Sequence, residues 1–314
     1  MRNLFRYFLS ALSFYLKNNI SKYKKKNLIF TNIIIKKLKQ KQNIKSLRKK
    51  THIIFNKEIV NLIIQKKLIN FLRNPFIQKM FFIHNRLFIK NELREIKNDI
   101  KGFSQWKKLL QEDNVGDPIR YFLYPKSSGN RIRQVYHLKK FCDFSKIKIK
   151  EIKKVLEIGG GYGCMARIFS KLNSKIKYII FDTFEVNLLQ YYYLKLNKLD
   201  ADIDNNKSKI NLSSSLKDIY KDDQNPQTLF IANWSLSEMP LKLRSRILEF
   251  TFKIPHILIS FQDNFENINN LKYFQKIKEK LDKKGYKTLV TGLQYYNNAI
   301  FNTNKHYYLF ATKN

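Results

Sequence analysis

The residues most suited to chemistry lie in a glycine-rich turn. Residues 159–163 read Gly-Gly-Gly-Tyr-Gly and directly follow the apolar run Val155 to Ile158. Glycine lets a backbone turn sharply at such a point and come into contact with a bound ligand. The segment therefore predicts a strand, a tight turn and a helix that hold a nucleotide-like ligand. The predicted binding positions are Glu157, whose carboxylate can accept hydrogen bonds from the ligand or the loop, and Gly159, Gly161 and Gly163.

A second acid follows at the end of the next apolar run. Asp182 ends the run that begins at Lys177, and it stands 25 residues after Glu157. An acid at this place can bind both ribose hydroxyls of an adenosyl group, since open α/β sheets bind ligands at the carboxyl ends of their strands. The alternative is a helix N-cap, a role that Thr183 can equally fill. The position of Asp182 favours cofactor binding.

Candidates for the acceptor side follow the apolar run Thr228 to Ala232. The chain there reads Asn233-Trp234-Ser235-Leu236-Ser237-Glu238-Met239-Pro240. This is not the Asn-Pro-Pro-Tyr type of motif that acts on exocyclic amines of bases, which argues against base N-methylation. We expect Asn233 to contact the cofactor. Glu238 is a candidate general base or hydroxyl ligand, or only a favourable charge at a helix N-terminus.

A histidine near the end of the chain is the second candidate base. His306 precedes the last predicted strand, although a lone histidine is more often structural. Further candidates are Gln262, Asp263 and His137. No cluster has a recognisable metal-ligand spacing, so no metal site is predicted.

The elements that must position these residues alternate between strand and helix. Strands are expected at 153–158, 177–182, 210–212, 228–232, 256–261, 287–291 and 307–312, and helices at 162–173, 184–199, 241–252 and 269–283. This alternation predicts an α/β fold with a mostly parallel sheet covered on both faces. The last two strands are joined without a predicted helix, so they should run antiparallel.

Two cofactor classes compete for this sheet. Gly161, Gly163 and Ala166 satisfy the dinucleotide fingerprint G-x-G-x-x-A. A Rossmann-like sheet with an antiparallel last strand is instead typical of class I methyltransferases. Together with Asp182, it favours S-adenosyl-L-methionine over a nicotinamide dinucleotide.

The charge of the chain is extreme and uneven. The 314 residues carry a net charge of +37, and residues 1–150 hold 36 Lys and Arg against 8 Asp and Glu. Such a half suggests an anionic partner. The competing explanation is the Lys-rich composition of an AT-rich genome, in which 49 Lys stand against 12 Arg. Both explanations stay open.

The chain divides into three predicted parts. Residues 1–100 are predicted to form a basic helical region, with helices at 2–17, 27–40, 52–72 and 76–98. Residues 101–150 are predicted to form a bridging, substrate-side segment, and residues 151–314 the cofactor-binding domain. The first part either caps the domain or makes peripheral contact with an anionic membrane surface. No run of about 18 apolar residues predicts a membrane span, and two cysteines make no disulfide framework. A cytoplasmic location is expected.

The bridging segment gathers aromatic rings and carboxylates in predicted loops. Trp106 precedes the turn-forming run Val115-Gly116-Asp117-Pro118, and Tyr121 and Tyr124 follow. Rings stack on the CH faces of sugars and carboxylates hold their hydroxyls. The alternative is a linker that packs Trp106 against the main domain.

Several blocks together resemble one family. The run Val155 to Gly163, the run Phe181-Asp182-Thr183-Phe184-Glu185, and Ser235-Leu236-Ser237-Glu238-Met239 resemble the sugar O-methyltransferase family of bacterial surface-polysaccharide gene clusters. Trp106 and Val115-Gly116-Asp117-Pro118 look like its upstream block, so the resemblance covers about residues 104–314. Members usually carry Asp-Leu-Pro-Glu after the second strand, a motif from which this chain departs while keeping Asp182.

The resemblance implies methyl transfer from S-adenosyl-L-methionine to a sugar hydroxyl in glycan biosynthesis, with a sugar or glycan as partner. Glu238 or His306 would then take the hydroxyl proton. Two rival functions are an RNA or protein methyltransferase, prompted by the basic first half, and a non-catalytic adenosyl-binding partner of a glycan assembly complex. Nucleic acid is not the expected partner; an RNA methyltransferase would need base-stacking aromatics on a basic face.

Overall fold

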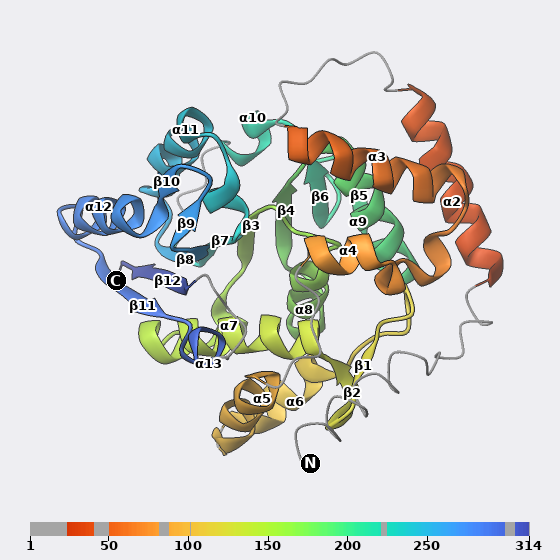
Figure 1. The fold of residues 1–314 in the computed structure, drawn as a ribbon. Helices are drawn as coiled ribbons and strands as arrows, with labels where there is room; N and C mark the ends of the chain where they lie inside the picture. The colour runs from red at the N-terminus through yellow and green to blue at the C-terminus, as the bar shows by residue number, and fades with distance from the viewer. Residues whose placement is uncertain are drawn as a thin grey trace.

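An eight-stranded sheet runs through the middle of the molecule (Figure 1). We analysed it in a computed structural model that describes residues 24–40, 50–81, 88–100, 102–220, 225–298 and 305–313. The strand order is β11-β12-β8-β7-β3-β4-β6-β5. Its strands are β3 (Lys154–Ile158), β4 (Lys177–Phe181), β5 (Ala201–Ile203), β6 (Ile210–Ser213), β7 (Thr228–Asn233), β8 (His256–Gln262), β11 (Lys287–Gly292) and β12 (His306–Thr312).

Strand β12 reverses the direction of the sheet. It pairs antiparallel with both β8 and β11, whereas the other neighbouring pairs of this sheet are parallel. The chain runs outward from β3 through β4 in one direction and from β7 through β8 in the other, so the carboxyl ends of β3 and β7 border the point where the strand order changes direction. Ligands bind at such points in open α/β sheets. The predicted fold class, including the antiparallel last strand, is confirmed.

Successive side chains of the strands enter two different cores. Val155 packs into the cluster on one face, and Leu156 packs into the cluster on the other. This alternation follows from the two-residue period of a strand, and it is why both faces must be covered by helices. One face is covered by α7 (Gly129–Ser145), α8 (Cys164–Leu172) and α9 (Phe184–Leu196), and the other by α10 (Leu216–Ile219), α11 (Leu241–Thr251) and α12 (Asn270–Asp282).

Most predicted boundaries in this half agree with the structure to within three residues. Several short elements of this half were not predicted, among them the following four. The edge strand β5 was not predicted, and the connection from β11 to β12 contains one helical turn, α13 (Gln294–Asn297). Beyond β8, a small antiparallel pair, β9 (Asn264–Phe265) with β10 (Ile268–Asn269), precedes α12.

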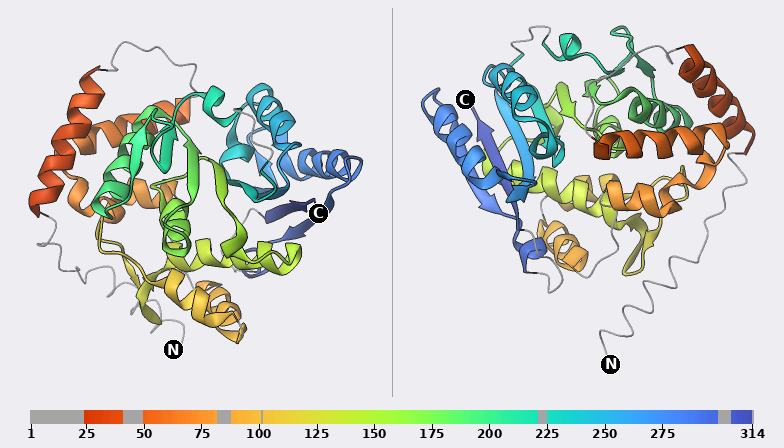
Figure 2. Two further views of the ribbon diagram at one scale, coloured as in Figure 1. Left: turned by 180° about the vertical axis from the view of Figure 1, so that it is seen from behind. Right: turned by 45° about the horizontal axis from the view of Figure 1, so that its top comes forward.

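The N-terminal region is helical; its first helices pack on the sheet domain beside α9, and its last two pack against α7 (Figure 2). Its elements are α2 (Lys24–Gln40), α3 (Lys50–Ile64), η2 (Leu68–Arg73), α4 (Pro75–Met80), α5 (Phe88–Asn98) and α6 (Phe103–Leu110).

Two of the predicted N-terminal helices differ in extent from the structure. The single helix predicted over 52–72 is broken near Lys66, whose φ of 55° is incompatible with a continuing right-handed helix. The helix predicted over 76–98 begins as α4 and ends as α5, and the residues between them lie outside those that the structure describes. The helix predicted over 2–17 also lies outside the described residues.

Residues 111–128 connect this region to α7. They contain the hairpin of β1 (Arg120–Tyr121) and β2 (Tyr124–Ser128), and the short η3 (Ile149–Glu151) follows α7. One continuous apolar core extends from Ile34 of α2 to Phe310 of β12. The domain boundaries at residues 100 and 150 stay predictions, since this core crosses both.

Candidate active site

The glycine turn between β3 and α8 has the backbone geometry that its sequence predicts. Gly159, Gly161 and Gly163 all have positive φ, at 71°, 56° and 92°, a region that glycine adopts without strain. Gly163 is the N-cap of α8. A Cβ on Gly159 would overlap the Cβ of Ser235, so the turn also needs glycine for close packing. The N–H of Gly159 donates to the Phe181 carbonyl at 2.9 Å, which ties the turn to the end of β4.

Glu157 lies beneath this turn rather than at its mouth. Its side chain is buried, and its Oε2 accepts a hydrogen bond from the Tyr178 hydroxyl at 2.8 Å. Burial raises the pKa of Glu157 to about 8, the Tyr178 hydrogen bond opposes the rise, and the nearby Asp182 adds to it. Glu157 is therefore largely protonated at neutral pH. A cation brought close to it would favour the ionised form.

Asp182 occupies the carboxyl end of β4, next to the turn. Its Oδ1 accepts from the Thr183 N–H at 2.8 Å, and its Oδ2 accepts from Nε2 of Gln190 at 3.0 Å. The same Gln190 amide donates to the Gly161 carbonyl at 3.0 Å, so one side chain holds the acid and the turn together. Burial raises the pKa of Asp182 to about 7, and hydrogen bonds from Thr183 and Gln190 oppose the rise. Asp182 stays half-buried, so a ligand can reach it.

The N-terminal region also contacts the turn. The ring of Phe81, just after α4, lies 3.4 Å from the position a Cβ would take on Gly161. Phe81 also contacts the Tyr162 ring, with 6.1 Å between centroids. No sequence pattern indicates this contact, because Phe81 and Gly161 are distant along the chain.

Asn233 begins a row of side chains near the carboxyl ends of β7 and β8. Its Oδ1 accepts from the Ser260 hydroxyl at 3.0 Å, and its Nδ2 donates to Oε1 of Gln134 at 3.3 Å. Ser260 stands in register with Asn233 on one side and with Tyr308 of β12 on the other. The row therefore joins β7, β8, β12 and helix α7 at one edge.

Glu238 reaches the same edge from η4 (Ser235–Glu238). Its Oε1 accepts from Nε2 of Gln262 at 3.2 Å, and the Oε1 of Gln262 accepts from the Ser237 hydroxyl at 2.7 Å. Gln262 is in register with His306. The structure thus brings the two predicted bases to the same end of β8 and β12, and Gln262 holds one of them. Asp263 follows Gln262, where its backbone N–H donates to the Lys305 carbonyl.

His306 lies in an aromatic enclosure. Its Nδ1 accepts from the indole Nε1–H of Trp234 at 2.7 Å, and its ring stacks on Tyr296 with 4.0 Å between centroids. The guanidinium of Arg133 lies 4.7 Å from the Trp234 ring centroid and 4.7 Å from that of Tyr296. Trp234 has a φ of 61°, a strained value of the kind that clusters at functional sites. Arg133 and Tyr296 were not predicted.

A second layer of buried polar groups lies behind this enclosure. His137 is fully buried, contacts the Trp234 ring edge-on, and has its Nδ1 within hydrogen-bond distance of the Tyr308 hydroxyl. Burial lowers its pKa well below the usual value, and the positive charge of Arg133 lowers it further, so His137 is neutral at pH 7. Burial raises the pKa of Glu92 in α5 to about 7, while Arg133 opposes the rise. Atoms Nε2 of His137 and Oε2 of Glu92 have no hydrogen-bond partner among the described residues.

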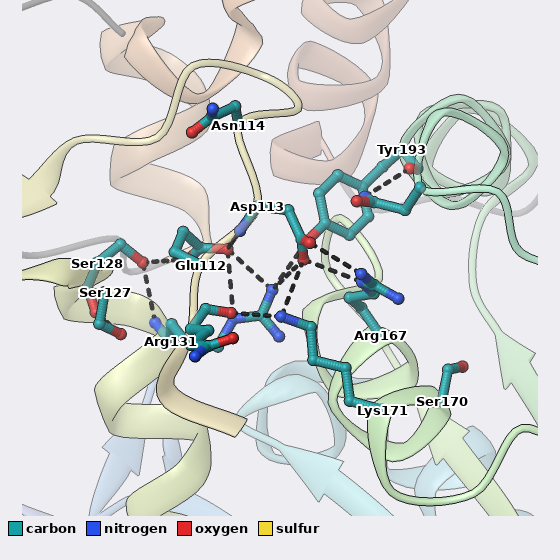
Figure 3. A network of polar contacts seen from close by, with 12 residues as sticks. Glu112, Asp113, Asn114, Ser127, Ser128, Arg131, Arg167, Ser170, Lys171 and Tyr193 are labelled. Carbon is teal, nitrogen blue, oxygen red and sulfur yellow. Dashed lines mark hydrogen bonds and ion pairs between the residues drawn. The ribbon is translucent and has the colours of Figure 1, made fainter. Parts of the chain in front are cut away.

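An ion network fixes the start of α7, which carries Arg133 and Gln134 (Figure 3). Arg131 is fully buried and donates to Oε1 of Glu112 at 2.8 Å and to Oδ2 of Asp113 at 3.3 Å. Asp113 also pairs with Arg167 of α8 at 2.8 Å. Burial alone would raise the pKa of Glu112, but the Arg131 charge and hydrogen bonds outweigh it and lower that pKa. The network attaches the bridging segment to both helices that flank the site.

Within the described ranges, no three His, Cys, Asp or Glu side chains form a group that could bind a metal ion. The part of the chain that the structure describes also has no helix long and apolar enough to cross a membrane.

No model of a known protein family matches the sequence, and no curated protein matches it. Solved structures with a similar fold include a SAM-dependent methyltransferase from Aquifex aeolicus, at 17% identity and TM-score 0.39, covering 55% of this chain and 86% of that one. An O-methyltransferase family protein from Burkholderia thailandensis is 9% identical with TM-score 0.38, covering 58% and 60%. PKMT2 from Rickettsia typhi, solved in complex with AdoHcy, is 12% identical with TM-score 0.39, covering 56% and 52%.

The strand order of this chain decides its fold class independently of those similarities. A mostly parallel sheet ordered β11-β12-β8-β7-β3-β4-β6, with β12 antiparallel, is the arrangement of class I methyltransferases. The glycine turn follows β3 and the acid follows β4. This chain has the Rossmann-like class I methyltransferase fold.

Proposed function

We propose that this protein transfers a methyl group from S-adenosyl-L-methionine to a sugar hydroxyl. The observation that carries the methyltransferase part is the joint placement of the glycine turn and Asp182 at the ends of neighbouring parallel strands β3 and β4, in a sheet whose last strand is antiparallel. The sugar as acceptor rests on the family resemblance of the sequence and on the polar groups beside the aromatic enclosure.

The donor side fits an adenosyl ligand. Asp182 is half-buried, and Thr183, Gln190 and the Gly160 N–H fill three of its about four acceptor positions, so a ribose hydroxyl can take the remaining lone pair. Oε1 of Gln190 is buried without a hydrogen-bond partner in the described parts of the chain. Such an atom is costly unless a ligand pairs with it. The N–H groups of the glycine turn would hold the methionine end, and Glu157 would act on it from beneath the turn.

When bound, S-adenosyl-L-methionine supplies an electrophilic methyl group on a sulfonium centre. The residues of this chain hold the acceptor oxygen in line with that methyl, and such positioning supplies up to about 7–11 kcal/mol of the barrier reduction. Glu238 is the proposed acceptor of the hydroxyl proton, which typically adds about 10²–10⁴-fold in rate. His306 accepts from Trp234 through Nδ1, so its neutral ring carries the proton on Nε2 and acts as a hydrogen-bond donor to the acceptor.

Two polar groups beside the aromatic enclosure support a sugar acceptor. Glu238 offers an acceptor and Nε2 of His306 a donor for sugar hydroxyls, while the packed rings of Trp234 and Tyr296 hold His306 in place.

The decisive test compares surface glycans of cells with and without the gene by mass spectrometry. In cells without the gene, one sugar should lack one methyl group and be lighter by about 14 mass units, the difference between CH₃ and H. Returning the gene should restore the methyl group. Glycans with identical masses in both strains, together with methyl incorporation into RNA or protein, would support the rival methyltransferases. Cofactor binding without any methyl turnover would support the non-catalytic partner.

Peripheral membrane contact is a separate proposal for the N-terminal region. Helix α2 exposes about half of the Leu28 and Ile29 side chains, at 49% and 50%, beside a lysine-rich sequence. Apolar side chains flanked by lysines suit an anionic interface. Sedimentation with vesicles that contain phosphatidylserine tests it, and binding equal to that with neutral vesicles would refute it.

A further inference from the structure

A polar side chain of the N-terminal region lies at the cofactor edge of the sheet. Asn56 is 4% exposed, and it shares the buried face of α3 with Ile59 and Ile63, which pack on the core beside α9. An amide on such a face costs free energy unless both its donor and its acceptor are paired. Its presence there calls for a partner.

Among the described residues, one end of the Asn56 amide is paired and the other is not. Oδ1 accepts from the Thr183 hydroxyl at 3.0 Å, and Nδ2 is buried with no hydrogen-bond partner. Thr183 directly follows Asp182, the residue at the end of β4. Rotating the amide by 180° would exchange the two atoms and leave the oxygen unpaired instead, so one hydrogen-bonding position stays open in either orientation.

Two more amides near Asp182 have the same incomplete pairing. Oδ1 of Asn187 and Oε1 of Gln190 are buried without partners in the ranges that the structure describes, and both residues lie in α9, which begins after Thr183. Nδ2 of Asn187 and Nε2 of Gln190 both donate to Asp182, to its carbonyl and its carboxylate. One unpaired donor and two unpaired acceptors therefore surround this corner. Adenosine carries ribose hydroxyls, ring nitrogens that accept, and an amine that donates, so it can pair with all three.

We infer that Asn56 is an adenosine-binding residue, supplied to the cofactor site by the N-terminal helical region. This inference rests on the proposed function, since it takes the adenosyl cofactor as the ligand. The N-terminal region then does more than cover the domain: α3 places an amide against the adenosine while its apolar residues hold it on α9. Phe81, from the same region, contacts the glycine turn at Gly161.

Isothermal titration of the full chain with S-adenosylhomocysteine tests the inference. Replacing Asn56 by leucine removes the amide, keeps the branching at Cγ and suits the apolar face. We expect Asn56→Leu to bind about 3- to 10-fold more weakly, the value of one hydrogen bond, with an unfolding midpoint without ligand that is no lower than wild type. If Asn56 has only a structural role, the unfolding midpoint of Asn56→Leu and its affinity for S-adenosylhomocysteine should fall together. Asn61→Leu is the matched control, because Asn61 lies on the exposed face of α3.

A second ligand separates adenosine from the rest of the cofactor. 5′-Methylthioadenosine keeps the adenosine and lacks the amino-acid end, so Asn56→Leu should weaken both ligands by the same factor. Wild-type affinity of Asn56→Leu for both ligands would overturn the inference and leave the proposed function standing, and so would weakening of S-adenosylhomocysteine alone. Failure of the wild-type chain to bind either ligand would overturn both. If Asn56→Leu fails to fold, Asn56→Ala is titrated beside Asn61→Ala, with the same outcomes.

Discussion

The indole N–H of Trp234 donates to Nδ1 of His306 at 2.7 Å, and this bond fixes which nitrogen of the histidine carries its proton. A neutral imidazole has one donor and one acceptor, so an Nδ1 that accepts leaves the proton on Nε2. The ring is held in place by stacking on Tyr296 and by its backbone N–H, which donates to Oδ1 of Asn297 at 2.7 Å. His306 therefore presents a donor of fixed orientation.

Two substitutions of His306 should distinguish its contribution to stability, through the hydrogen bond from Trp234, from its contribution to methyl transfer. Asparagine can place its Oδ1 near the position of Nδ1 and keep the acceptor for Trp234, whereas alanine leaves a buried N–H unpaired. We expect His306→Asn to unfold within about 1 kcal/mol of wild type and His306→Ala to lose about 1–3 kcal/mol. Both should reduce methyl transfer by about 10- to 1000-fold, since both lack the Nε2 donor. Denaturant unfolding and incorporation of labelled methyl into glycan measure the two effects.

The outcome that contradicts this account is retained activity in His306→Asn. It would show that His306 only supports Trp234, and the strained Trp234 backbone would then be the feature to pursue.

Glu157 predicts how stability depends on pH. Its pKa is raised to about 8 in the folded protein from an ordinary 4.5. At a pH between these two values the carboxyl is protonated in the folded protein and ionised in the unfolded chain, so unfolding releases a proton. Stability from the neutral carboxyl is complete below about pH 4.5 and is lost as the pH rises towards 8, with a total change of a few kcal/mol. Glu157→Gln should flatten this fall and raise the unfolding midpoint at pH 8. Differential scanning calorimetry from about pH 5 to about pH 8.5 measures it.

The matched control is Glu151→Gln, because Glu151 is an exposed carboxyl just before the same strand. Its pH profile should equal that of wild type. An unchanged profile in Glu157→Gln would mean that the carboxyl is ionised and stabilised in the folded protein. Asp182, with its pKa raised to about 7, contributes a fall of the same sign in all three proteins.

The sequence alone predicts those parts of the site that depend on local patterns of apolar residues and glycines. Val155 and Leu156 face opposite cores because a buried strand is apolar on both sides, and the glycines and Asp182 lie where such strands end. The contacts of Phe81 with Gly161 and of Asn56 with Thr183 join segments far apart in the chain. Neither has a periodic or motif signal, because each depends on how α3 and α4 pack. The same holds for Arg133, whose two aromatic neighbours come from the end of β7 and from α13.

The close approach of Gly159 to Ser235 can be tested by a rescue experiment. Gly159→Ala places a methyl group on top of the Ser235 Cβ at a φ of 71°, so it should lose about 2–4 kcal/mol and abolish cofactor binding. Replacing Ser235 by glycine as well removes the clashing atom and should recover about 1 kcal/mol or more. Chemical denaturation of the single and double variants measures this recovery.

Gly285→Ala supplies the control for backbone strain alone. Gly285 has a φ of 81°, and no atom of the described residues lies within 4 Å of the position that its added methyl group would take. Its variant should therefore lose only about 1–2 kcal/mol. Equal losses at both glycines would show that the contact with Ser235 carries no energy.

The buried pair of Glu112 and Arg131 should behave differently from a surface pair. Both side chains are almost fully buried and 2.8 Å apart, so Glu112→Gln leaves the Arg131 charge without its main counter-ion. Removing one partner of a buried pair typically costs about 3–5 kcal/mol. The exposed pair of Lys278 and Asp282, 2.7 Å apart, should lose less than about 1 kcal/mol in Asp282→Asn.

The double variant Glu112→Gln with Arg131→Met decides between two roles for this pair. Replacing both charges by neutral groups of similar size is often neutral, so the double variant should regain most of the stability lost by Glu112→Gln. If the network of Figure 3 also positions α7, the double variant should still bind S-adenosylhomocysteine yet transfer methyl groups more slowly, because Gln134 and Arg133 follow Arg131 on the helix that borders Asn233. Wild-type transfer rates in the double variant would limit the pair to a purely stabilising role.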